Sequence, residues 1–415
     1  MELSRRDFLT ATSGAAVLAG LGGASAAAAE EDPLGVRKDF PALREYTYLN
    51  TAYIGLIPQA VVDAGRDWLE ARAHRTYTVQ QMQAKTDETR KLFARMVGAG
   101  EDEIGFLFST SEGENVVVNS LDFKPGDNVV IDDLVYPSTP VIDRRLEKTK
   151  GVELRMVKHR NGAATVEDFA RLVDDRTRLI SVALVSNMSG FRHDMKGLAD
   201  LAHARGAYLY TDAVQAIGTG PIDVRALGID FLTTGSYKWL MAGFGVAPFY
   251  VRRELLDRIH PANVGWQVEK RLENYEYQHY RTARKFEYAS LAFGEIYQLA
   301  AALAYLQGIG LDKIEAQSLA LAQQLRTGLA DRGIRIFTPE GNRSSILSFY
   351  IRKEMPEAQK ILDAEQVRVS LQNGDRTEAY GGTGPVVRVR VSLSFFNNAA
   401  EVQRMLSVAD KLAAT

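Results

Sequence analysis

The feature that most constrains the fold is an alternation of short apolar, β-rich runs with helical patterns downstream of about Asn50. Such alternation predicts parallel strands joined by crossover helices. The expected strands are 104–108, 128–132, 152–157, 178–185, 207–213, 230–235 and 245–251. The expected helices between them include 112–121, 141–150 and 194–204. The sequence therefore predicts an α/β fold with a mostly parallel, seven-stranded sheet.

The pattern changes after Phe293, where an Ala/Leu-rich helix at 294–306 leads into a second helix at 312–331. Four strand candidates (334–339, 344–351, 367–372 and 385–394) and helices near 356–363 and 399–413 follow. We expect four regions: a signal at 1–30, an N-terminal segment near the active site at 31–55, a large α/β domain at 56–293 and a smaller α+β domain at 294–415. The glycine-rich stretch 372–385 is expected to be a mobile loop.

Composition excludes several classes of function. The chain has 415 residues, a formal net charge of -2 and no cysteine. A charge this close to neutral gives no support for binding nucleic acid or a membrane surface. The absence of cysteine removes disulfides, zinc–thiolate sites and any thiol nucleophile on this chain, and we expect no metal site.

The first thirty residues have the pattern of a twin-arginine export signal. Arg5 and Arg6 precede Phe8 and Leu9, and the apolar run 11–23 is followed by the small residues of 24–30. The alternatives are a disordered basic start or a short anchor if cleavage fails, but the run is too short to span a bilayer comfortably. We expect a cleaved signal and a periplasmic or secreted protein. This route carries folded proteins, often with a cofactor already inserted.

Chemically useful side chains collect where the predicted strands end, which is where open parallel sheets bind ligands. Lys238 lies in "TTGSYKWL", and Asp212 ends an apolar strand three residues before Gln215. A carboxylate at the end of a buried strand is costly unless a cation meets it. Taken alone, Asp212 could be a helix N-cap. Because only one further strand separates them, Lys238 and Asp212 are expected to face one crevice.

Three more motifs lie at such strand ends. "STSEGEN" (109–115) opens a helix whose first N–H groups could hold a phosphate, although a plain N-cap run looks the same. Glu112 in this motif is expected to point away from an anion. Tyr136 in "DLVYPS" could stack on a flat ring or simply pack. Asn187 follows a strongly apolar strand.

One cofactor explains this set economically. Pyridoxal phosphate needs an amine for its aldehyde, a carboxylate to keep its ring nitrogen protonated, a phosphate anchor and a partner for the ring face. Lys238 and Asp212 supply the first two, and the 109–115 turn and Tyr136 the others. Gln215 and Asn187 would suit the ring hydroxyl.

With these residues the sequence resembles the fold-type I, class V aminotransferase-like enzymes, a family that includes cysteine desulfurases and isopenicillin-N epimerase. The segments that carry the resemblance are 48–58, 212–218 and 235–247. It implies the type I pyridoxal-phosphate fold, with Lys238 as the covalent lysine, Asp212 as the partner of the ring nitrogen and Tyr136 as the stacking residue. It also implies a phosphate loop at Ser111, Glu112 and Gly113, to which Ser236 adds a hydroxyl.

The resemblance extends to substrate and partner. Arg390 in "VRVRVSLSFFN" would clamp a substrate carboxylate, although Arg388 lies on the same face and could substitute, or Arg390 could face solvent. Ser290 in "KFEYASLAF" would reach the phosphate of a neighbouring subunit, which implies a homodimer. Tyr237 stands where many relatives have histidine, which weakens any assignment of substrate.

The absence of cysteine also guides the choice of reaction. A cysteine desulfurase needs a thiol to receive sulfur, so we expect that this protein is not one unless a partner supplies the thiol. Transamination of an amino acid, or of a peptide or secondary-metabolite amine, needs only Lys238 as acid and base and ranks first. Epimerisation or racemisation needs a second acid–base group, for which Tyr53, Tyr237, His193 and the mobile loop are candidates, although ordinary packing or solvation is the favoured interpretation of each. A lyase ranks third, and an exported binding module is the non-enzymatic alternative.

Overall fold

The computed structural model describes residues 32–374 and 386–414. The predicted export signal and most of the predicted mobile loop lie outside these residues. Among the helices that are described, none is long and apolar enough to cross a membrane.

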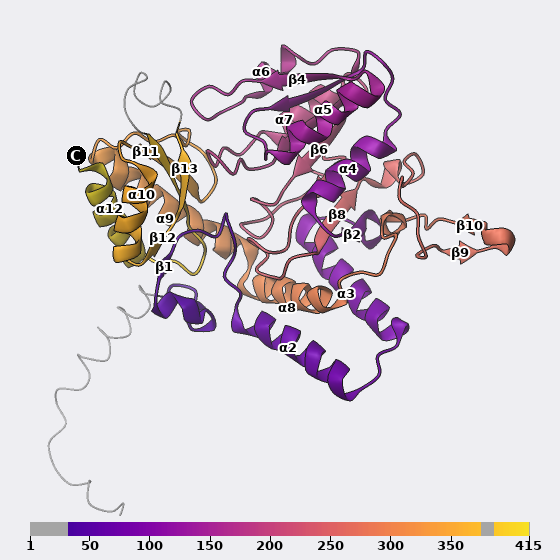
Figure 1. The fold of residues 1–415 in the computed structure, drawn as a ribbon, viewed down its shortest axis with the longest axis horizontal. Helices are drawn as coiled ribbons and strands as arrows, with labels where there is room; N and C mark the ends of the chain where they lie inside the picture. Colours follow the sequence, from indigo (N-terminus) through magenta and orange to yellow (C-terminus); the bar gives the residue numbers. More distant parts are fainter. Residues whose placement is uncertain (1–31, 375–385, 415) are drawn as a thin grey trace, which may run out of the picture.

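A seven-stranded sheet forms the centre of the larger part of the molecule, with the order β2-β8-β7-β6-β5-β3-β4 (Figure 1). All neighbouring pairs are parallel except those of β8, which runs antiparallel to β2 and β7. The predicted mostly parallel α/β sheet is therefore confirmed. The strands are β2 (Ile104–Leu107), β3 (Asn128–Asp132), β4 (Glu153–Val157), β5 (Thr177–Ala183), β6 (Tyr208–Asp212), β7 (Phe231–Thr233) and β8 (Ala247–Val251).

Helices cover both faces of this sheet, and its strands are therefore nearly continuous apolar runs in the sequence. Every residue of β2, β3, β7 and β8 is buried. Side chains of α3 (Val79–Val97), α7 (Met195–His203) and α8 (Phe293–Ile309) join one core cluster. Those of α4 (Thr110–Ser120) and α5 (Ser138–Lys150) join the other. The short α6 (Val166–Ala170) adds Phe169 to the first cluster.

The helices before β2 were not assigned from the sequence. They are α2 (Gln59–His74) and α3, the latter opened by a capping box between Thr78 and Gln81. Both pack against α8, and the three lie side by side in Figure 1. The predicted boundary after Phe293 placed this Ala/Leu-rich helix in the smaller domain. Its buried residues Ile296, Leu299 and Leu303 instead belong to the core of the large sheet.

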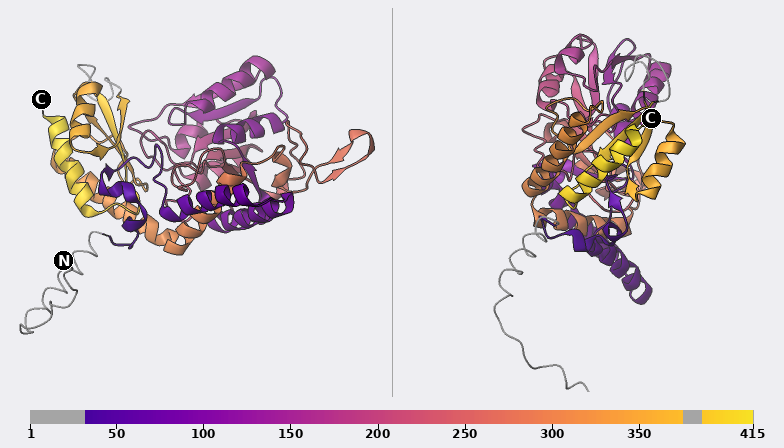
Figure 2. Two further views of the ribbon diagram at one scale, coloured as in Figure 1. Left: turned by 60° about the horizontal axis from the view of Figure 1, so that its bottom comes forward. Right: turned by 90° about the vertical axis from the view of Figure 1, so that its left-hand side faces the viewer.

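A second, antiparallel sheet has the order β11-β14-β13, from Ile346–Ile351, Val387–Ser392 and Ser370–Asn373. The helices α9 (Leu311–Asp331), α10 (Met355–Ala364) and α12 (Ala399–Ala413) share its apolar core. Figure 2 shows this unit beside the larger one. The predicted strand 334–339 makes only an isolated bridge, Ile336 to Phe349.

The N-terminal segment links the two units. Its β1 (Thr47–Tyr48) pairs with β12 (Val367–Arg368) of the smaller unit. The N–H of Ala52 donates to Ser392 Oγ in β14 (2.9 Å), and the N–H of Gly55 donates to the carbonyl oxygen of Tyr237 in the larger unit (2.9 Å). A hairpin of β9 (Lys270–Arg271) and β10 (Tyr277–Gln278) projects on the opposite side (Figure 1). The remaining elements are short 3₁₀ turns: η1 (Arg37–Asp39), η2 (Pro41–Arg44), η3 (Glu101–Glu103), η4 (Arg253–Leu255), η5 (Glu273–Tyr275) and η6 (Ala283–Phe286).

Candidate active site

A cavity of about 290 Å³ lies where β6 and β7 end and α4 begins. This is the carboxyl edge of the parallel strands, as the topology requires for a ligand site. The sheet thus brings together residues more than a hundred positions apart in the sequence. Among the lining residues are Ser111, Glu114, Tyr136, Asp212, Tyr237 and Lys238.

Lys238 is held by a tight turn that follows β7. The hydroxyl of Ser236 donates to the carbonyl oxygen of Val246 (2.8 Å), and the N–H of Met241 donates to that of Lys238 (3.1 Å). The N-terminal segment presses on this turn, because a Cβ at Gly55 would lie 1.9 Å from the Lys238 carbonyl oxygen. Only glycine fits there, so the backbone that carries the lysine is fixed on two sides.

The amine of Lys238 has the properties of a nucleophile. The residue is buried, and that burial lowers the pKa of its amine to about 8, with a further lowering from Arg390 and an opposing effect of Asp212. Its Nζ lies 5.9 Å from the centre of the Tyr136 ring and 5.5 Å from that of Tyr237. A buried amine of this kind carries far more of its neutral form near pH 8 than a surface lysine does.

Asp212 ends β6, and its Oδ1 accepts the N–H of Val214 (2.8 Å). Burial raises the pKa of this carboxyl, while the Val214 N–H and Lys238 lower it. A carboxylate placed in this way is stabilised by a cation that enters the cavity. It therefore suits the protonated nitrogen of a pyridine ring.

The start of α4 provides N–H donors, but not all of the predicted ones. Ser109 accepts the N–H of Glu112 with its hydroxyl (3.1 Å) and that of Gly113 with its carbonyl oxygen (3.2 Å). Thr110 and Ser111, in the first turn, line the cavity, and their N–H groups have no carbonyl partner within the helix. The predicted donors Glu112 and Gly113 are thus engaged, and the donors that face the cavity are those of Thr110 and Ser111.

Two details of this turn explain its residues. The side chain of Glu112 bends back, and its Oε2 accepts the N–H of Phe108 (2.7 Å), so the carboxylate is held by the backbone, as its expected orientation away from an anion requires. A Cβ at Gly113 would lie 2.1 Å from Thr233 Oγ1. The glycine therefore lets α4 approach β7 closely enough for the helix start to reach the cavity.

Three predicted cofactor ligands have other partners. Gln215 is buried with its amide bonded to Ala52 O (2.9 Å) and to the Trp239 indole N–H (2.8 Å). The hydroxyl of Ser236 is bonded within its own turn, and the backbone carbonyl oxygen of Asn187 accepts a hydrogen bond from Arg390. None of the three is among the residues that line this cavity. In this conformation the three residues contact segments around the cavity and do not face it.

The two arginines of β14 differ in their surroundings. Arg388 donates to Gln372 Oε1 (2.8 Å) and lies over the ring of Phe337. Arg390 is buried, donates from Nη1 to Asn187 O (3.0 Å), and leaves its buried Nε without a hydrogen-bond partner. Burial, with a further effect of Arg388, lowers the pKa of Arg390 to about 10. Its unfilled donor and its electrostatic effect on Lys238 make Arg390 the better carboxylate ligand of the pair.

The other predicted residues divide between the site and the rest of the molecule. Tyr237 lines the cavity, and its ring stacks on Phe244 (4.2 Å between centres). His193 is buried and bonded to Asp132 (2.6 Å), and it is not among the cavity's lining residues. Tyr53 is exposed. Ser290 is exposed beside a different cavity, next to Trp68 and Tyr77, and it is not among the residues that line the Lys238 cavity.

Sequence reasoning missed Glu114. It lies four residues after Thr110, and therefore on the same face of α4, and it lines the cavity although it is buried. The i, i+4 spacing within the quoted motif was the signal that could have found it.

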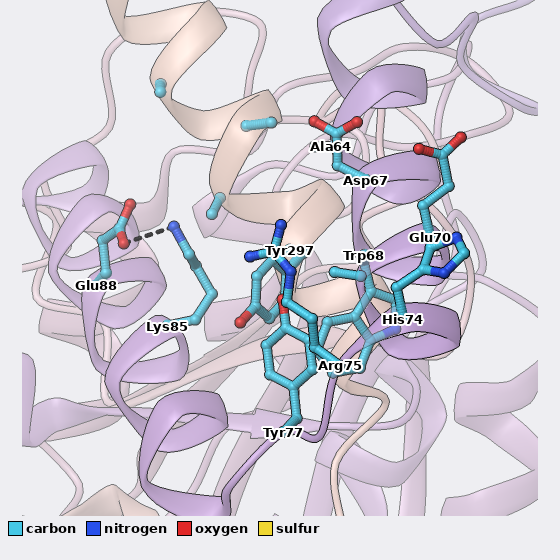
Figure 3. Close-up of a pocket in the computed structure, with 14 residues that line it drawn as sticks. Ala64, Asp67, Trp68, Glu70, His74, Arg75, Tyr77, Lys85, Glu88 and Tyr297 are labelled. Carbon is cyan, nitrogen blue, oxygen red and sulfur yellow. Dashed lines mark hydrogen bonds and ion pairs between the residues drawn. The ribbon is translucent and has the colours of Figure 1, made fainter.

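A larger cavity of about 630 Å³ lies elsewhere, between α2, α3 and α8 (Figure 3). Trp68, Tyr77 and Tyr297 form its aromatic wall. Its lysine, Lys85, is partly exposed and bonded to Glu88 (2.6 Å), the contact drawn as a dashed line in Figure 3. It lacks a buried amine paired with a strand-end carboxylate, so size alone does not mark the active site.

The fold and the cavity define a pyridoxal-phosphate enzyme of fold type I. Residues 47–405 match the family model described as Aminotransferase class-V, and the chain belongs to that family. It is 29% identical over 398 residues to a protein named "Probable cysteine desulfurase" of Pyrococcus abyssi, covering 92% of this chain and 97% of the relative. It is 28% identical over 312 residues to the "Uncharacterized aminotransferase YcbU" of Bacillus subtilis, covering 75% and 83%.

A solved structure gives the same result. The apo structure of a cysteine desulfurase from Thermococcus onnurineus NA1 has a TM-score of 0.82 at 28% identity, over 92% of this chain and 98% of that one. Pyridoxal phosphate, predicted from the residues, is confirmed as the cofactor. The cavity fits it, because it offers a buried amine, a strand-end carboxylate, free N–H donors of a helix start and an aromatic ring.

These relatives correct the expected function. Transamination ranked first and cysteine desulfuration was set aside because the chain has no cysteine, but several similar relatives are named cysteine desulfurase or probable cysteine desulfurase. The physical reason for the error is that the missing thiol limits where the sulfur goes. It does not limit whether the carbon–sulfur bond can be broken.

Proposed function

We propose that the protein cleaves the carbon–sulfur bond of cysteine or a close analogue, and that the sulfur passes to a thiol outside this chain. The observation that carries the proposal is the similarity to cysteine desulfurases along nearly the whole chain. It is supported by a small cavity lined by Lys238 and Asp212, and by the electrostatic effect of Arg390 on Lys238. Because the chain has no cysteine, none of its residues can hold a persulfide, and the sulfur must pass to an external acceptor.

Bound pyridoxal phosphate supplies an aldehyde for the substrate amine and a protonated ring that withdraws electrons from the α-carbon. The chain's own residues do the rest. Asp212 holds the proton on the ring nitrogen, and the N–H groups of Thr110 and Ser111 bind the phosphate at the positive end of α4. Arg390 binds the substrate carboxylate. Lys238 would move the proton at the α-carbon, for which a pKa of about 8 is suitable.

The proposed reaction balances without an added oxidant. Cysteine and an acceptor thiol become alanine and a persulfide: the bond between Cβ and sulfur breaks, and a sulfur–sulfur bond forms on the acceptor. Cβ gains a hydrogen and is reduced, while the transferred sulfur is oxidised to the sulfane level. The thiol proton of cysteine remains with the products.

The test is to incubate the purified holoenzyme with cysteine, with and without dithiothreitol, and to measure alanine and released sulfide. We expect equal amounts of both and strong dependence on the added thiol. The Lys238→Ala variant is the matched negative control. Formation of pyruvate, or of the amine form of the cofactor with a keto acid, in place of alanine would reject the proposal.

We also propose that the chain is exported by its N-terminal signal and acts as a homodimer in which Ser290 contributes to the neighbouring site. The exposure of Ser290 and its place beside a different cavity support the second part. Mass spectrometry of the mature N-terminus and light scattering test the two parts separately. An intact N-terminus on protein confined to the cytoplasmic fraction would contradict the first, and a monomer would contradict the second.

A further inference from the structure

Glu114 is an acid in the cofactor cavity that the proposed reaction does not use. It is buried on α4, and it lines the same cavity as Asp212 and Lys238. Its Oε1 accepts the hydroxyl of Ser181 (2.8 Å), and its Oε2 accepts that of Thr139 (2.9 Å). Among the interactions of the described residues, no cation pairs with it, so an ionised Glu114 would be held by hydroxyl groups alone.

The groups that face Glu114 are mostly acids. Asp143 on α5 is buried, and neither of its carboxyl oxygens has a hydrogen-bond partner within the described chain. Asp212 and the buried Tyr210 lie on β6, and both interact electrostatically with it. Lys238 is the nearby cation, but it acts on Asp212. A carboxyl group in such a place retains its proton to higher pH than a surface glutamate does.

We propose that Glu114 is a positioning residue of the cofactor site. It is uncharged in mildly acidic solution, and on ionising it adds a second negative charge to the wall that carries Asp212. The charge that opposes the cofactor's ring nitrogen therefore depends on pH, through a residue that does not touch the reacting atoms. The inference rests on the cofactor and not on the proposed carbon–sulfur cleavage.

The electrostatics agree with this geometry. Burial raises the pKa of Glu114 from 4.5 to about 7, Asp212 raises it further, and the Ser181 and Thr139 hydroxyls lower it. Burial, with a further effect of Glu114, raises the pKa of Asp143 well above its ordinary value. Because the folded state binds the Glu114 proton more tightly than the unfolded chain, Glu114 makes stability fall as pH rises from about 4.5 to about 7.

Two readouts that need no substrate test the proposal. The first is the absorbance of the bound cofactor from pH 5.5 to 9. In Glu114→Gln, the protonated form of the cofactor loses a stabilising negative charge, so we expect its midpoint about one pH unit below that of the wild type. The second is the melting temperature of the cofactor-free protein, whose fall between pH 5 and 7 should flatten in the same variant.

Glu147→Gln is the matched control, because Glu147 lies on α5 beside solvent and pairs with Arg144. It should leave both titrations at the wild-type positions. If Glu114→Gln does not fold, Ser181→Ala provides the test: loss of one hydroxyl donor should displace the ionisation of Glu114 to higher pH, so the cofactor midpoint should again move to lower pH, by less than in Glu114→Gln. Identical titrations in wild type and in whichever variant folds would overturn the proposal, even if the enzyme desulfurates cysteine.

Discussion

In the described part of the chain, a lysine lies among aromatic rings both in the cavity at the strand ends and in the larger cavity between α2, α3 and α8, and the first of these is the one suited to chemistry. In the larger one, Lys85 is partly exposed and bonded to Glu88 (Figure 3). In the smaller one, Lys238 is buried, interacts with Asp212 and Arg390, and forms no ion pair within 4 Å among the described residues. The comparison teaches that a lysine amine becomes reactive when it is desolvated and free of an ion pair. A large cavity with aromatic rings in its wall does not make a lysine reactive by itself.

The largest expected effect is that of Lys238→Ala. The variant loses both the amine that bonds the cofactor and the group that moves the α-proton, so turnover should fall on the order of 10³- to 10⁴-fold. Borohydride treatment of the wild type should fix the cofactor to the chain, and treatment of the variant should not. Cofactor fixed to the variant would break the contrast between the two lysines.

The pH dependence of cofactor capture follows from the same burial. Only the neutral amine attacks an aldehyde, and with a pKa of about 8 instead of 10.5 the neutral fraction near pH 7 is larger by roughly 300-fold. The rate at which the cofactor-free protein binds pyridoxal phosphate should therefore rise with pH and level off above about pH 8. A rate that still climbs towards pH 10 would mean that Lys238 is as solvated as Lys85.

Asp212→Asn tests the second difference between the cavities, a carboxylate directed at a bound cation. The amide keeps the size and can keep the bond to the Val214 N–H, but it cannot hold the ring proton by charge. We expect turnover to fall about 10²-fold with the cofactor still bound. The measurements are steady-state kinetics and the cofactor spectrum. Undiminished turnover would show that the ring nitrogen needs no acid here.

Arg390→Lys should have a smaller effect. It keeps a positive charge but loses the planar pair of donors that suits a carboxylate, so we expect KM for the amino acid to rise about tenfold with little change in kcat. Arg388→Lys is the matched control on the same face, because Arg388 is bonded to Gln372. An equal rise in KM for both variants would mean that neighbouring arginines share the role.

The sequence predicted the sheet, the cofactor and the positions of Lys238, Asp212 and Tyr136, because all of these follow from strand ends on a parallel sheet. It could not predict which N–H groups of α4 remain free, since that depends on the bonds that Ser109 makes with Glu112 and Gly113. It also placed Gln215 at the cofactor, whereas the amide is bonded to Trp239 and Ala52. Contacts between segments distant in the sequence decide such details, and no local pattern contains them.

The smallest expected effect is that of Lys85→Ala, the same substitution in the other cavity. An ion pair between partly exposed side chains contributes about 0.2–1 kcal/mol, so the free energy of unfolding should fall by less than about 1 kcal/mol. Turnover and cofactor content should stay within about twofold of the wild type, because no step needs this amine. Thermal denaturation, cofactor absorbance and kinetics measured beside Lys238→Ala give the contrast directly. Loss of cofactor from Lys85→Ala would show that the larger cavity supports the site, and the two cavities could then no longer be treated as independent.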